Sequence, residues 1–216
     1  MLDTVLLVLL LLVVPGYRVA RSWKASDRPA PPRRRRYLQT IALALALDAV
    51  LAAAWWKTGR PLLALGLDVP PTFAGLAGIA AAVCLFAVLA FAVRRNGGIA
   101  KGNATRVPEF LPENGQDLAL FLAFAVSVGV SWEVLYRGYL MWSLRPHLGT
   151  LGAIALASAS YGLAHGVTSW KNLMASLISA LVFTLAYAVS GSLWWLMILH
   201  TGLPLLPLLS PQKRLD

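Results

Sequence analysis

Charged residues are scarce in this chain, and their scarcity excludes an ordinary water-soluble fold. Only 13% of the 216 residues are Asp, Glu, Lys or Arg, whereas 58% are hydrophobic, and the mean hydropathy is +0.68. Soluble domains are about 25% charged and about 45–50% apolar. A soluble fold of this length has no interior large enough to hide so much apolar surface. The sequence therefore predicts an integral membrane protein in contact with the lipid bilayer.

Cysteine and acidic residues are also few. The single cysteine, Cys84, lies inside an apolar stretch, which excludes an intrachain disulfide and a cysteine-based zinc site. The net charge of +10 would indicate nucleic acid binding in a soluble protein. Here the basic residues stand in short runs between apolar stretches, and no basic face alternates with aromatic residues. We therefore expect no nucleic-acid partner.

Seven apolar stretches predict an all-α fold, a polytopic transmembrane helix bundle. The first stretch, residues 2–17, is short and contains Pro15, so the number becomes six if this stretch is not a true span. It lacks the basic start and small-residue cleavage pattern of a signal peptide, so we interpret it as a reverse signal anchor. The other spans are expected at about 37–56, 73–93, 117–138, 151–167, 173–189 and 193–209.

Lysine and arginine set the expected orientation. Residues 18–36 form the most basic loop, and assigning it to the cytoplasm puts most of the 19 Lys and Arg residues on that side. This predicts an outside N-terminus, an inside C-terminus and a bacterial cytoplasmic membrane as the location. We divide the chain into N-terminal spans with the basic loop (1–116), a core of helices (117–209) and a C-terminal tail (210–216).

Ionisable side chains at membrane depth are costly, so the few present are candidates for function. Glu133 and Arg137 are four residues apart and can pair on one helix face. Tyr161 and His165 have the same spacing, so the phenol and the imidazole point the same way. Asp48, in the second span, is interpreted as a helix-packing group.

His200 lies in the last span, one turn before Pro204, where the helix must loosen. Together with Glu133 and His165 it gives one carboxylate and two histidines on three helices. A carboxylate can take a proton from water, and histidines can position that water or hold an oxyanion. The same three residues are also a known set of zinc ligands, so zinc stays open as a cofactor. A buried ion pair with two carbonyl-bound histidines is the structural alternative.

Three motifs in the second half of the chain resemble the CPBP family, the CAAX-processing and bacteriocin-processing intramembrane proteases also called Abi proteins. The motifs are Glu133-Val-Leu-Tyr-Arg137-Gly-Tyr-Leu, Tyr161-Gly-Leu-Ala-His165, and Gly191-Ser-Leu-Trp-Trp-Leu-Met-Ile-Leu-His200. The resemblance covers roughly residues 120–209. It implies peptide-bond hydrolysis in a membrane-associated or lipidated protein or peptide. It also implies Glu133, His165, His200 and Arg137 as catalytic residues, with or without a metal.

The chain departs from the family pattern at two positions. The first motif is Glu-Glu-x-x-x-Arg, and Trp132 stands where the first, water-activating glutamate is expected. The third motif is His-x-x-x-Asn or Asp, and Pro204 stands at its end. Trp132, Tyr161 and Pro204 are therefore assigned to the substrate-binding cavity.

Two functional interpretations follow from these departures. In the first, Glu133 takes over as base and the protein is an intramembrane endopeptidase that needs no cofactor. In the second, the protein is a catalytically impaired pseudoprotease that acts in peptide binding, immunity or sorting. A small transporter with Asp48 and the histidines as a proton relay is a third class. The sequence shows no inverted repeat to favour it.

Overall fold

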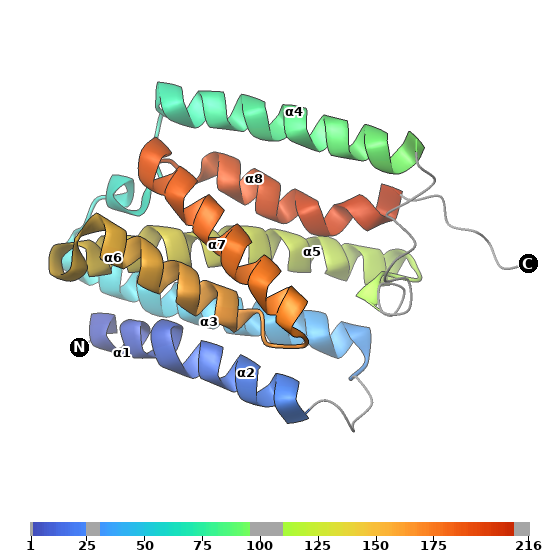
Figure 1. Cartoon of the computed structure of the whole chain (residues 1–216), viewed down its shortest axis with the longest axis horizontal. Coiled ribbons are helices and arrows are strands. Elements are labelled where there is room, and N and C mark those ends of the chain that lie inside the picture. Colours follow the sequence, from blue (N-terminus) through green and yellow to red (C-terminus); the bar gives the residue numbers. More distant parts are fainter. Residues whose placement is uncertain (1, 25–30, 96–109, 210–216) are drawn as a thin grey trace, which may run out of the picture.

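The computed structural model describes residues 2–24, 31–95 and 110–209, and helices are the regular structure found in these ranges. The predicted all-α fold is confirmed (Figure 1). The elements in chain order are α1 (Leu2–Val8), η1 (Leu9–Val13), α2 (Val14–Lys24), α3 (Arg33–Thr58), η2 (Leu62–Leu65), α4 (Phe73–Arg95), α5 (Gly115–Trp132), η5 (Glu133–Tyr139), α6 (Leu140–Ala164), α7 (Trp170–Ser190), α8 (Trp194–Gly202) and η6 (Leu203–Leu209). The C-terminal tail predicted over 210–216 lies outside the described residues.

Most of the helices are long and apolar enough to cross a bilayer. Within the described residues five helical stretches meet that criterion, and a shorter apolar helix covers Trp194–Leu209. The five are Leu2–Trp23, Arg33–Thr58, Phe73–Arg95, Gly115–Ala164 and Trp170–Ser190. Large apolar side chains stay exposed along them, as lipid contact requires, and α4 is the least buried inside the bundle. The chain is an integral membrane protein.

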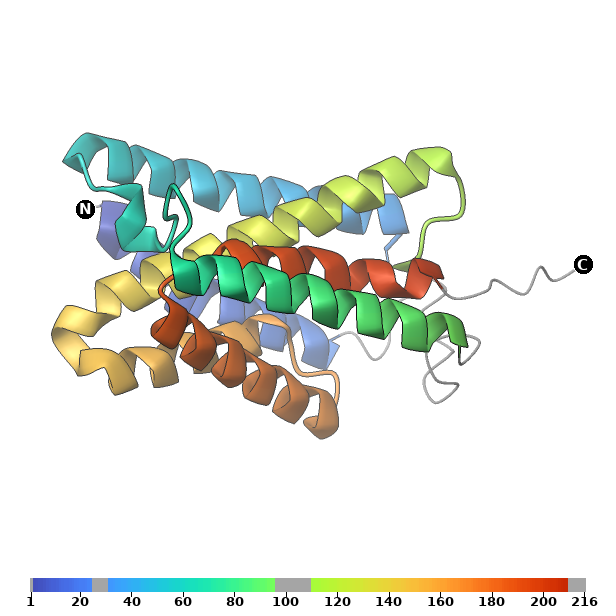
Figure 2. The same cartoon turned by 90° about the horizontal axis from the view of Figure 1, so that it is seen from above.

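The stretch Gly115–Ala164 is two helices joined by a reversal. Its 50 residues would extend roughly 75 Å as one helix, more than twice the thickness of a hydrocarbon core. Gly149 interrupts α6 with a φ of 67°, a conformation that a residue without a side chain adopts at little cost. Figure 2 shows the ribbon turning back at the end of the bundle. Dividing the stretch at Gly149 and adding Trp194–Leu209 agrees with the predicted number of about seven spans.

The first helix is part of the core despite its proline. Pro15 has no N–H, and the π-helical turn η1 bonds five residues back, so the Leu10 carbonyl is left without a helical donor. Ser160 donates to that carbonyl at 2.6 Å and Tyr136 at 3.3 Å. The side chains of Leu6 and Leu10 are fully buried. Hydrogen bonds therefore join the first span to the second half of the chain.

The basic segment is more helical than expected, and the prediction of one loop over 18–36 was wrong. The helices α2 and α3 extend into it from both sides. Arginine and lysine are good helix formers, so the segment does not interrupt a helix by itself. At the start of α3, Arg33 pairs with Glu113 and Arg34 pairs with Asp117 beside the start of α5. These contacts fix the first turn of α3 against α5.

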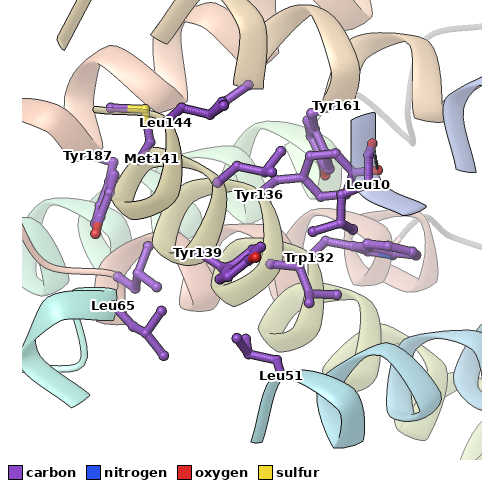
Figure 3. Packing of buried hydrophobic residues seen from close by; sticks show 14 of the residues in the cluster. Leu10, Leu51, Leu65, Trp132, Tyr136, Tyr139, Met141, Leu144, Tyr161 and Tyr187 are labelled. Carbon is purple, nitrogen blue, oxygen red and sulfur yellow. Dashed lines mark hydrogen bonds between the residues drawn. The ribbon is translucent and has the colours of Figure 1, made fainter. Parts of the chain in front are cut away.

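The core is centred on η5, whose residues are almost all buried. Figure 3 shows aromatic and aliphatic side chains from the first helix, α3, η2, α6 and α7 packed around this segment. The helix α8 packs against both α4 and α5 (Figure 1). As expected, the helix loosens before Pro204, because α8 ends at Gly202 and a 3₁₀ helix follows. This arrangement buries Glu133 and Arg137 in the middle of the bundle, whereas His200 is half-buried and His165 is exposed.

Candidate active site

A buried ion pair forms the centre of the site. An Nη1 N–H of Arg137 donates to Glu133 Oε1 at 2.9 Å, and both side chains are essentially unexposed. The two residues lie in η5, a π-helical turn that bonds i to i+5 and therefore holds an extra residue. Such turns are rare and occur frequently at functional sites. The ion pair expected from the spacing of four residues is present.

His200 reaches the same carboxylate from α8. Its Nδ1 lies 2.7 Å from Glu133 Oε1, the oxygen that also accepts from Arg137. The approach depends on Gly129, one turn before Glu133, because a Cβ at this position would lie 2.5 Å from the backbone nitrogen of Thr201. Any side chain on residue 129 would push α8, and His200 with it, away from α5.

Tyr161 and His165 join the cluster from the second half of α6. The Tyr161 hydroxyl lies 3.1 Å from His200 Nε2 and 3.4 Å from Nδ1. The face of the Tyr161 ring carries the Arg137 guanidinium at 4.1 Å, a cation–π contact. His165 stacks edge-on against the same ring at 4.6 Å, and its Nδ1 lies 3.0 Å from the Tyr161 carbonyl oxygen. Together with Glu133, these side chains form one connected network of five residues.

The structure brings the predicted trio together only in part. Glu133 and His200 are in direct contact, whereas His165 is connected to them through Tyr161. Sequence reasoning had placed Tyr161 in the cavity wall and had missed its contact with His200. The phenol at the fourth residue before His165 was the available signal, but the partner of its hydroxyl lies on another helix.

The Glu133–Arg137 pair has buried polar atoms that could form further hydrogen bonds. Among the described residues, Glu133 Oε2 and the Nε and Nη2 atoms of Arg137 have no hydrogen-bond partner, although all three atoms are buried. Unsatisfied polar atoms at such depth are costly, because protein interiors pair nearly all of theirs. One acceptor and two donors beside a buried base are what a water molecule or a peptide group would use.

The two departures from the family pattern lie on either side of this network. Trp132 is buried at the end of α5, and its ring packs 5.8 Å from that of Tyr136. Pro204 is half-buried in η6, the turn after His200. Trp132 has no side-chain group that can act as a base, and Pro204 has none that can donate a hydrogen bond to an oxyanion.

The donor set does not fit a zinc ion. No three His, Cys, Asp or Glu side chains lie close enough together to hold a metal within the described ranges. His165 uses Nδ1 on a backbone carbonyl, and the Arg137 guanidinium lies 2.9 Å from the Glu133 oxygen that a metal would take. A neighbouring cation repels a divalent metal. We derive no step through a metal.

A polar network outside the spans fixes the start of α8. The Asp68 carboxylate accepts from the Ser192 hydroxyl at 2.7 Å and from the Thr72 backbone N–H at 2.5 Å. The Asp68 carbonyl accepts from Trp194 Nε1 at 2.8 Å. Burial opposes ionisation of Asp68, yet these hydrogen bonds outweigh it and hold its pKa below the ordinary value. The loop before α4 thereby positions the helix that carries His200.

Asp48, the remaining polar group at membrane depth, contacts a different face of α5. It accepts from the Ser131 hydroxyl at 2.5 Å, which joins α3 to α5. Ser131 is buried, and Asp48 is half-buried. This contact is the kind expected of a helix-packing group.

An apolar pocket of about 800 Å³ lies beside α8, and its lining residues do not include the five side chains of the network. It lies between α4, α5 and α8, and its walls include Ile79, Phe86, Val126, Val130 and Ile198. Thr201, the residue after His200, also lines it. Cavities of this volume hold ligands of moderate size, and the lining is suited to a hydrocarbon chain.

Comparison with known families agrees with this geometry. Residues 114–206 match the family described as Type II CAAX prenyl endopeptidase Rce1-like. This segment is Rce1-like. The resemblance to the CPBP family inferred from the sequence is confirmed over the Rce1-like segment, which contains Glu133, Arg137, Tyr161, His165 and His200. No curated protein and no solved structure matches the chain.

Proposed function

We propose that the protein is an intramembrane endopeptidase that hydrolyses a peptide bond in a membrane-associated or lipidated protein or peptide. The observation that carries the proposal is the Glu133–His200 contact of 2.7 Å, buried inside an Rce1-like segment. A carboxylate and an imidazole held together at membrane depth form a pair that can accept and return a proton. Residues 117–209 are the proposed catalytic core, with 1–116 as the accessory spans.

The proposed roles follow from the contacts. The Glu133–His200 pair removes a proton from the attacking water and returns it to the leaving amine. Arg137 orients the Glu133 carboxyl group through its 2.9 Å bond. His165, fixed by the Tyr161 carbonyl at 3.0 Å, keeps its second ring nitrogen for the water or the substrate. No cofactor is needed for this chemistry.

The substrate class is supported by the cavity. Its lining is almost entirely apolar, so a chain of methylene or isoprene units could leave the lipid phase and enter it without exposure to water. Val126 lines the cavity on α5, seven residues before Glu133. Val126→Trp is expected to raise the KM for a lipidated peptide more than tenfold and to leave the KM of the same peptide without its lipid unchanged. Equal effects on both peptides would contradict a lipid-binding role.

The activity is tested with purified variants and a panel of membrane-anchored peptides. The variants are wild type, His165→Ala, Trp132→Glu and, as a matched control, His147→Ala, because His147 is exposed and lies away from the network. Cleavage by wild type and His147→Ala, with loss of at least a hundredfold in His165→Ala, supports the endopeptidase.

The alternative function is a pseudoprotease that binds a peptide or a partner helix. Its support is the buried Trp132 at the position of the first glutamate. It predicts cleavage by Trp132→Glu alone, with the natural chain inactive on every peptide of the panel. It also predicts that the biological function survives His165→Ala and His200→Ala.

The proposed orientation is N-terminus outside and C-terminus inside, in the cytoplasmic membrane of a bacterium. Its support is the distribution of charge over the described residues. The end of the bundle that holds the start of α3 and the end of α4 carries Arg33–Arg36, Arg94 and Arg95. Fewer basic residues, Lys57 and Arg60 among them, lie toward the opposite end. Cytoplasmic loops are the basic ones in membrane proteins.

A further inference from the structure

The hydrogen bonds of His200 define which of its ring nitrogens carries the proton. Glu133 Oε1 already accepts from Arg137 at 2.9 Å, and the same oxygen acts as the acceptor toward His200 Nδ1 at 2.7 Å. Nδ1 must then be the donor. The neutral ring has one donor and one acceptor, so Nε2 is the acceptor and the Tyr161 hydroxyl donates to it at 3.1 Å.

The same arrangement of a carboxylate, an imidazole and a hydroxyl operates in nucleophilic enzymes. There the carboxylate holds the tautomer and the orientation of the imidazole, and the far nitrogen of the ring is the base. In this chain the Glu133 carboxylate lies on Nδ1, and the far nitrogen, Nε2, faces a phenol. The carboxylate is therefore placed to position the base.

The ring of Tyr161 is held firmly, while its hydroxyl is able to turn. The Arg137 guanidinium lies 4.1 Å from the ring centroid, and the rings of Tyr136 and His165 lie 5.0 Å and 4.6 Å away. A phenol rotates its O–H bond without moving the ring. The hydroxyl oxygen is thus fixed in place, and its O–H bond can turn from His200 Nε2 toward an acceptor on a bound substrate.

We propose that, in the hydrolysis described above, His200 Nε2 takes the proton from water and the Tyr161 hydroxyl donates to the carbonyl oxygen of the scissile peptide. Glu133 is then a positioning residue, and His200 and Tyr161 are the catalytic residues. The inference rests on the proposed function and assigns the roles within its site.

The reaction balances with these groups alone. Water forms a C–O bond to the peptide carbon as one of its protons passes to His200 Nε2. The carbonyl π electrons move to oxygen, and the resulting oxyanion accepts the hydrogen bond of Tyr161. The C–N bond then breaks, its electron pair stays on nitrogen, and that nitrogen takes the proton from Nε2. The carbonyl re-forms as a carboxylic acid, and His200 returns to its neutral state.

One arrangement accounts for both departures from the family pattern. Trp132 stands where the family pattern has its first glutamate, and His200, held by Glu133, supplies a base instead. Pro204 stands where the third motif has Asn or Asp. The Tyr161 hydroxyl, beside His200, supplies a hydrogen-bond donor instead.

The first experiment compares Tyr161→Phe with Tyr136→Phe on a peptide that the wild type cleaves. Both variants lose one hydroxyl from the same aromatic cluster, but that of Tyr136 donates to the Leu10 carbonyl at 3.3 Å, away from His200. Loss of one oxyanion donor commonly lowers kcat by about 10²- to 10³-fold. We expect a loss of that size in Tyr161→Phe with KM unchanged, and near wild-type kcat in Tyr136→Phe.

The second experiment reads the tautomer directly, by nitrogen-15 NMR of the imidazoles in the full-length chain, with His200→Ala used for assignment. We expect the proton on Nδ1 of His200. A proton on Nε2 overturns the proposal even if the chain cleaves nothing. Equal kcat in the two phenylalanine variants of an active enzyme overturns the proposal and leaves the endopeptidase standing. A wild type without any cleavage removes the endopeptidase, and the assignment of catalytic roles with it.

Discussion

Arg137 is fully buried and donates to a single carboxylate oxygen. The desolvation of its charge is therefore only partly compensated by the ion pair at the centre of the site. Its Nε and Nη2 atoms have no partner among the described residues, and its remaining contact is the face of Tyr161 at 4.1 Å. Buried pairs of this kind contribute little net stability, although removal of one partner costs much because the other charge is left alone. The pair is therefore better explained by what it positions than by what it stabilises.

Removing one charge of the pair should destabilise the protein more than removing both charges, although either change should abolish activity. Arg137→Met leaves the Glu133 carboxylate without its cation and should lower the free energy of unfolding by about 3–5 kcal/mol. The double variant Glu133→Leu/Arg137→Met removes both charges and should recover most of that loss. Both variants should be inactive. Thermal unfolding in detergent measures the first effect, and a double variant no more stable than Arg137→Met would contradict it.

At this scale the sequence predicts pairs within a helix and misses pairs between helices. The spacing of Glu133 and Arg137 was sufficient to predict their contact, because i and i+4 lie on one face. The contact of His200 with Glu133, at 2.7 Å, depends on the position of α8 along α5. That position is set by packing over the whole bundle, which local spacing does not encode.

Close contact between α5 and α8 determines whether the two halves of the site meet. Gly129→Val adds a branched side chain where even a Cβ lies 2.5 Å from the backbone of Thr201. The helices must separate, and overpacking of this kind costs about 1–3 kcal/mol. We expect a loss of at least a hundredfold in kcat/KM, measured on the peptide panel. Gly115→Ala on the same helix meets no atom within 4 Å and is the matched control. Equal activity in both variants would show that α8 needs no close approach.

Asp68, in the loop that positions α8, makes the stability of the fold depend on pH. The pKa of Asp68 is lowered in the folded protein, so its hydrogen bonds add stability above the ordinary aspartate pKa of about 3.9. That contribution is lost as the pH falls through the lowered value, because the carboxyl group is then protonated in both the folded and the unfolded protein. Asp68→Asn should therefore lower the melting temperature at pH 7.

The difference between Asp68→Asn and wild type should shrink as the pH falls toward 3. Melting temperatures of the two proteins in detergent, recorded from pH 7 to pH 3, test this expectation. A gap that stays constant over the whole range would mean that ionisation of Asp68 contributes nothing to the fold.

The elements themselves differ in how far they could be predicted. Hydropathy located the spans, because each apolar run reports its own burial in lipid. The π-helical turns were not predictable, since η1 depends on Pro15 together with distant hydroxyl donors for the Leu10 carbonyl, and η5 depends on packing around it. The ends of α2 and α3 were missed because arginine serves equally well in a loop and in a helix.

The distribution of charge over the whole molecule predicts its orientation. Cys84 is the single cysteine and is exposed on α4, so Cys84→Ser gives a background without thiols. Arg35→Cys and Lys57→Cys, both at exposed positions, then report the two ends of α3. A membrane-impermeant maleimide added to intact cells should label Lys57→Cys at once and Arg35→Cys only after permeabilisation. The reverse order would place the N-terminus inside.

The hydrogen bond between Ser160 and the Leu10 carbonyl has a consequence for biosynthesis. Its two partners are 150 residues apart, so the first helix enters the membrane long before its acceptor can be paired. At translation rates of about 5–20 residues per second, the interval is roughly 8–30 s. During that time the first helix must remain near the growing chain with an unpaired carbonyl in lipid. The first helix is thus inserted well before the helix α6 to which Ser160 joins it.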